Sequence, residues 1–77
     1  MKRTKVAYKK LRTAWGYAYL NQNKIELYHK LKGKKHLEII LHEKLHLMLP
    51  EWDEPSIKKH SKDICDLLWH EGYRLIK

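Results

Sequence analysis

Two histidines and a glutamate near the middle of the chain have the residue types and the spacing of a zinc site. His42 and His46 are four residues apart, and Glu43 follows the first of them. On a helix this spacing stacks both imidazoles on one face, with their Cβ atoms about 5–6 Å apart, so they can share one metal ion. Glu43 then projects to the side, where it can take a proton from a metal-bound water without ligating the metal. The motif therefore predicts a hydrolase with one zinc ion per chain and Glu43 as general base.

A catalytic zinc ion normally has three protein ligands and one open position. Three downstream residues are candidates for the third ligand. Glu54 is preferred, because it opens the second predicted helix on that helix's inner face. His60 comes next, toward the edge of the same face. Asp53 comes last, because an aspartate immediately before a helix is better suited to capping it.

A helix over residues 34–49 must carry the histidine pair. Apolar residues occur around most of its circumference: Ile40, Leu41, Leu45 and Met48 fall on the side of Leu37, and Ile39 and Leu49 fall on the other. This distribution predicts a buried central helix, which Pro50 ends. Six histidines in 77 residues make a chance match to the motif conceivable, but two unliganded histidines inside a core would need another explanation.

A second helix is predicted over residues 54–71. Asp53 is its expected N-cap, Pro55 fits its first turn, and Gly72 suits its C-terminal end. Its inner stripe is expected to consist of Ile57, Ser61, Ile64, Cys65 and Leu68.

The residues before these helices predict a small antiparallel sheet. Residues 15–20 are aromatic-rich and favour a strand, residues 21–23 have turn chemistry, and residues 25–28 alternate like a second strand. They form a hairpin near 15–28. Residues 5–12 fit either an edge strand or a short helix. Together the elements predict one α+β domain, 1–77, with Trp15, Trp52 and Trp69 packed in its core or at the core's edge.

The chain carries a net charge of +8, from 17 lysines and arginines against nine acidic residues. Such an excess favours polyanionic partners such as nucleic acid, although it can also serve only to keep a small protein soluble. The single cysteine, Cys65, excludes an internal disulfide and indicates a reducing compartment. No signal peptide is expected, because no apolar stretch follows Met1-Lys2-Arg3. No membrane span is expected either, because charged residues interrupt the longest apolar run. We therefore expect a cytoplasmic protein.

The order of the parts resembles that of small zincin-type metallopeptidases. The matching elements are Trp15-Gly16 opening a strand, its partner strand around Ile25, and then the helix with His42-Glu43-Lys44-Leu45-His46. The chain is similar over roughly 15–74 to SprT-like and small phage-type metallopeptidases, and more loosely to ImmA/IrrE-like peptidases. Only the His-Glu-x-x-His element of this resemblance is specific.

The resemblance implies a peptide or protein substrate, held in extended form at a sheet edge beside the metal-site helix. In ImmA/IrrE-like proteins a downstream glutamate is the third ligand, which is the precedent for Glu54. SprT-like proteins use a third histidine shortly after the motif, whereas here the next one is His60. Two alternatives stay open. One is a non-catalytic basic module that binds a structural zinc and nucleic acid, and the other is a metal-free core with buried histidines.

Overall fold

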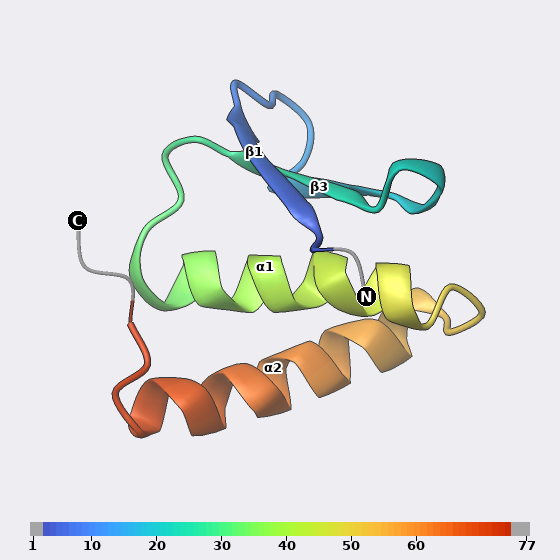
Figure 1. The fold of residues 1–77 in the computed structure, drawn as a ribbon. Coiled ribbons are helices and arrows are strands. Elements are labelled where there is room, and N and C mark those ends of the chain that lie inside the picture. The colour runs from blue at the N-terminus through green and yellow to red at the C-terminus, as the bar shows by residue number, and fades with distance from the viewer. Residues whose placement is uncertain (1–2, 75–77) are drawn as a thin grey trace.

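The computed structural model describes residues 3–74. The elements in chain order are the strands β1 (Lys5–Lys9) and β2 (Gly16–Tyr19), a 3-10 turn (Leu20–Gln22), the strand β3 (Lys24–Tyr28), and the helices α1 (Gly33–Met48) and α2 (Glu54–His70). Figure 1 shows α1 lying between the sheet and α2, which runs back along it. The predicted α+β architecture is confirmed.

The sheet has the strand order β1-β3-β2. The predicted hairpin is confirmed, because β2 and β3 pair in antiparallel fashion, with Ala18 opposite Ile25. Asn23 closes the turn in the left-handed conformation, at φ 46°, which asparagine tolerates better than most residues. Residues 5–9 form an edge strand, but it runs parallel to β3, with Val6 opposite Ile25. The sheet is therefore mixed, and the prediction of a purely antiparallel sheet was wrong for this strand.

The direction of β1 follows from where the hairpin lies. The segment after β1 crosses to the far edge of the sheet and enters β2, which leaves a gap one strand wide. β2 runs in the direction opposite to β1, and β3 returns antiparallel to β2 and fills that gap, so β3 runs parallel to β1. Residue patterning within each strand cannot reveal this arrangement.

Helix α1 is the central element, as predicted, although it spans Gly33–Met48 and not 34–49. The helix is less completely buried than predicted. His36, Ile39 and Glu43 are its buried residues, whereas Met48 is 60% exposed. Because the side near Ile39 faces the sheet, the stripe that begins at Leu37 remains only partly covered.

Helix α2 has the predicted caps and ends at His70, one residue before the predicted end. The Asp53 carboxylate accepts a hydrogen bond of 3.0 Å from the Ser56 backbone N–H, and Gly72 follows the helix with φ at 90°. Of the predicted inner stripe, Ile57, Ser61 and Cys65 are buried and Leu68 is half-buried. Ile64 is 39% exposed, so its assignment to the stripe was wrong.

The apolar core is small and lies between the sheet and α1. The buried members of this cluster are Ile25, Leu27, Leu31 and Ile39, and Ile57 and Cys65 of α2 are buried as well. Across residues 3–74, neither helix is long and apolar enough to cross a membrane.

Candidate metal centre

The two histidines of the motif meet on one side of α1. Because they lie one helical turn apart, their Nε2 atoms approach to 3.2 Å, and their ring centroids are 4.8 Å apart. The side chains are only partly buried, with 15% of His42 and 27% of His46 exposed. Both Nε2 atoms are therefore directed at one point near the surface.

Glu54 reaches the same point from the first turn of α2. One carboxylate oxygen, Oε1, lies 2.6 Å from His42 Nε2, and Oε2 lies 3.0 Å from His46 Nε2. The Asp53 cap fixes where α2 begins, and thereby where Glu54 stands relative to α1. Within residues 3–74, His42, His46 and Glu54 are the metal-ligating side chains that converge, with one ligand atom from each within 4.8 Å of the others.

The spacing of the two imidazole nitrogens fits a zinc ion, whereas the Glu54 oxygens lie at hydrogen-bond distance from them, at 2.6 and 3.0 Å, and would have to move outward to share the ion. Zinc bonds to imidazole nitrogen are about 2.0–2.1 Å long and tetrahedrally arranged, which places two ligand nitrogens about 3.3 Å apart. The 3.2 Å between His42 Nε2 and His46 Nε2 is close to that distance. Two imidazoles and a carboxylate are also a common ligand set for catalytic zinc. Glu54 is 63% exposed, so the group opens toward solvent.

Glu43 lies beside this group but is not part of it. It is 8% exposed, which is unusual for a glutamate. Burial raises the pKa of its carboxyl, because withdrawal from water disfavours the charged form, and the neighbouring His42 and His46 partly oppose this. The carboxyl therefore holds a proton more readily than an exposed glutamate.

The first residue of β2 packs directly onto Glu43. A Cβ atom added to Gly16 would lie 3.0 Å from Glu43 Cγ, 3.0 Å from the Glu26 carbonyl oxygen and 3.2 Å from Ile39 Cγ2. The strand can approach the helix this closely because Gly16 has no side chain. The sequence shows Gly16 as the start of a strand, but its contact with Glu43 depends on the tertiary packing.

Two hollows flank the metal-ligating group. The first, about 380 Å³, is lined by Gly16, Tyr17, Ala18, Leu20, His42, Glu43, His46, Pro50 and Glu54. The other also borders His42, Glu43 and Glu54 and continues to Ala14, Trp15, Lys35, Glu38 and Lys58. β2 is an edge strand, and its residues border the first hollow along its length.

The other two candidates for the third ligand lie elsewhere. The His60 ring donates from Nδ1 to the Ser56 carbonyl oxygen at 2.7 Å, and it packs against Trp52 with ring centroids 4.7 Å apart. Asp53 is occupied as the N-cap of α2, and its hydrogen bonds from Ser56 lower the pKa of its carboxyl. Of the three candidates, Glu54 is the one that the fold brings to both imidazoles.

Comparisons with protein-family models, with curated proteins and with solved structures found no match to this chain.

Proposed function

We propose that the protein is a zinc-dependent metallopeptidase, with His42, His46 and Glu54 as zinc ligands and Glu43 as general base. The observation that carries this proposal is the convergence of two imidazole Nε2 atoms and one carboxylate, with a buried second carboxyl beside them. A zinc ion bound there would polarise a carbonyl group and lower the pKa of a bound water to about 7.

The ligand set favours a catalytic site over a structural one. A structural zinc normally takes four protein ligands, whereas a catalytic zinc takes three and keeps one position open. Three ligands converge among residues 3–74. His60, the nearest candidate for a fourth, is held by Ser56 and Trp52.

Glu43 suits the role of proton carrier. A catalytic base works best when its pKa lies near the working pH, and burial shifts the pKa of Glu43 in that direction. Its carboxyl lines both hollows beside the ligands. In this position it would accept a proton from the attacking water and pass it to the departing amine.

A peptide is the proposed substrate because β2 presents a free strand edge along the hollow. An extended peptide can add to such an edge through main-chain hydrogen bonds. This placement agrees with the binding mode that the resemblance to zincin-type peptidases implies. We further propose a cytoplasmic location, where the free, buried Cys65 would remain reduced.

Metal analysis and hydrolysis of a quenched fluorescent peptide library test the proposal together. We expect one zinc per chain and a chelator-sensitive activity. Glu43→Gln should retain the zinc and lose at least about 100-fold in turnover, since proton transfer by a positioned side chain contributes about 10²–10⁴-fold. Glu51→Gln is the matched control, because Glu51 is exposed and lies outside both hollows.

Two results would overturn the proposal. If the protein binds no zinc and its melting temperature is unchanged by chelator, the histidine pair is a metal-free feature of the fold. If zinc binds but Glu43→Gln keeps full turnover, Glu43 is not the general base.

A further inference from the structure

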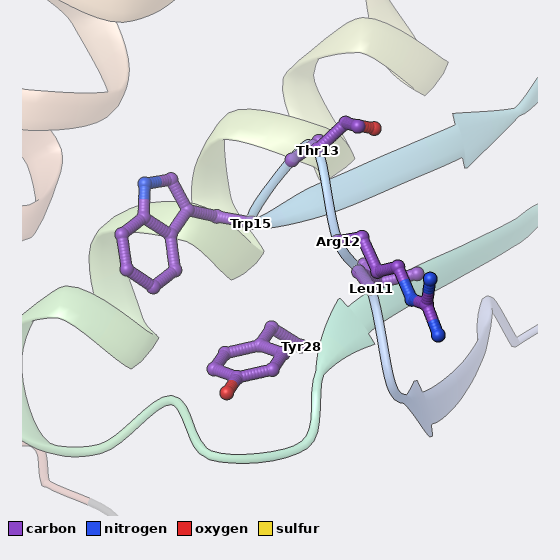
Figure 2. Close-up of a pocket in the computed structure, with 6 residues that line it drawn as sticks. Leu11, Arg12, Thr13, Trp15 and Tyr28 are labelled. Atoms are coloured by element: carbon purple, nitrogen blue, oxygen red, sulfur yellow. The ribbon is translucent and has the colours of Figure 1, made fainter.

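A third hollow, of about 400 Å³, lies next to Trp15 and uses none of the metal-ligating residues. It is lined by Leu11, Arg12, Thr13, Ala14, Trp15 and Tyr28. We call it the Trp15 pocket. Figure 2 shows the indole of Trp15 and the ring of Tyr28 on the same side of the segment that carries Leu11 to Thr13, with the Arg12 guanidinium extending from the other side.

The backbone segments that carry the two rings of the Trp15 pocket are hydrogen-bonded to each other. The Tyr28 N–H donates to the Trp15 carbonyl oxygen at 2.8 Å, and the ring centroids are 5.9 Å apart in an edge-on arrangement. The Trp15 side chain nevertheless remains open, since the residue is 52% exposed. The prediction that Trp15 packs in the core or at its edge was therefore wrong. The structure presents an uncovered aromatic surface.

The electrostatic surroundings of this aromatic surface are cationic. Arg12 is exposed and has no ion pair within residues 3–74, and no acidic side chain lines the Trp15 pocket. The Lys35 Nζ lies 5.5 Å from the centre of the Trp15 ring. It also forms an ion pair with Glu38, at 3.8 Å from Oε2. The whole chain carries a charge of +8. A ligand for this pocket should therefore be anionic and have a flat face.

We propose that the Trp15 pocket binds single-stranded nucleic acid, with a base against Trp15 and Tyr28 and the flanking phosphates on Arg12 and Lys35. Single strands are bound without sequence preference by cationic surfaces that carry exposed aromatic rings, since every base has a face that can stack. An acidic peptide would match the charge but does not offer a planar group at each residue. A duplex offers phosphates but keeps its bases stacked internally.

The Trp15 pocket does not depend on zinc and adds to the proposed function. The two hollows beside His42, Glu43 and Glu54 together form what we call the metal cleft, and Trp15 also borders the second of them. A bound strand would therefore lie beside the metal cleft.

Fluorescence anisotropy of a labelled ten-residue oligothymidine tests this assignment, using the intact protein with chelator and again with zinc. We expect binding that weakens as salt rises, because cationic side chains displace counterions from phosphates. Arg12→Glu should weaken binding about tenfold or more, and Trp15→Leu by a similar factor through the lost stacking. Lys59→Glu is the charge-matched control and should change the affinity less than about twofold, because Lys59 lies on α2 and does not line the Trp15 pocket.

The competing outcomes are distinct. A duplex or a polyglutamate peptide that competes as well as unlabelled oligothymidine would refute base recognition. Equal losses in Arg12→Glu and Lys59→Glu would refute the location, as would undetectable binding of the oligothymidine. Arg12 is exposed, so its variant tests the site even if Trp15→Leu fails to fold. Failure of the peptidase proposal would leave these measurements unchanged.

Discussion

The metal cleft and the Trp15 pocket lie on either side of one tryptophan, but the chain builds them differently. The ligands of the cleft come from α1 and the first turn of α2, where helical geometry fixes each side chain relative to the next. The Trp15 pocket is built from a loop and the end of β3, and the hydrogen bond between Tyr28 and Trp15 holds it together. A sequence motif marks the metal cleft, whereas no motif marks the Trp15 pocket.

The two proposals together place two kinds of recognition close together in a small chain. A metal site needs atoms placed to within a few tenths of an ångström, and regular helices provide that precision. A surface that stacks bases needs only a rigid ring and nearby cations. The following predictions test whether the two regions are as independent as their construction implies.

The largest effect is expected from His46→Ala in the metal cleft. Loss of a residue that merely supports a metal ligand lowers affinity about 10–100-fold, so loss of a ligand should exceed about 100-fold. Competition with a chromophoric zinc chelator measures the change. His60→Ala should stay within about twofold of the parent protein, since His60 contacts Ser56 and Trp52 and not the ligand group. If His46→Ala and His60→Ala lost equal zinc affinity, His60 would have to be part of the metal site.

Gly16→Ala tests the contact between the sheet edge and Glu43. The added methyl group meets Glu43, Ile39 and the Glu26 carbonyl oxygen at 3.0–3.2 Å. Overpacking of this kind costs about 1–3 kcal/mol of stability, and displacement of Glu43 should lower kcat about tenfold or more. Urea denaturation and peptide hydrolysis measure the two effects.

Gly33→Ala is the control for this substitution. Gly33 has φ at +60°, and a Cβ atom added there would meet Trp69 Cη2 at 3.7 Å, an ordinary van der Waals distance. Gly33→Ala should lower the free energy of unfolding by about 1–2 kcal/mol through backbone strain alone. It should leave kcat unchanged. If Gly33→Ala lowers kcat as much as Gly16→Ala does, the loss reflects general destabilisation.

Asp53→Ala should lower the melting temperature by an amount that depends on pH. Hydrogen bonds from Ser56 hold the pKa of Asp53 below its ordinary value of 3.8, so the stabilising contribution is present above that value. It is lost as the pH falls through the lowered pKa. The difference in melting temperature between Asp53→Ala and the parent protein should therefore become smaller in acid. Calorimetry measures this difference, and a chelator in the buffer removes any contribution from zinc binding.

Asp53→Asn provides the comparison, because asparagine can cap the helix without carrying a charge. Its melting temperature should lie above that of Asp53→Ala at neutral pH. Its difference from Asp53→Ala should change less with pH than the difference between the parent protein and Asp53→Ala does. A gap between Asp53→Ala and the parent that stays constant from neutral pH to strong acid would show that the charge of the cap contributes nothing.

The smallest effect is expected from Arg12→Glu on zinc binding. Arg12 lines the Trp15 pocket but neither hollow beside the ligands. The zinc affinity should therefore change less than about twofold, given that solvent and salt screen exposed charges. The same chelator competition measures it. A loss of tenfold would mean that the two regions are coupled.

Local sequence was sufficient to predict several features of the fold. Asp53 and Pro55 marked the start of α2, Gly72 marked its end, and the turn residues between the hairpin strands were recognised. These predictions succeeded because each depends on the backbone chemistry of a few neighbouring residues. The predictions for Met48, Ile64 and Trp15 failed because burial depends on which faces the rest of the chain covers.

The sequence by itself determined that His42 and His46 share one face of a helix, because an α-helix has 3.6 residues per turn whatever surrounds it. Only the tertiary structure decided that Glu54, and neither His60 nor Asp53, approaches both imidazoles. It also decided that Gly16 packs on Glu43 and that Trp15 stays open. Helical spacing is a local property, whereas these contacts depend on how the sheet and two helices together bury a small core.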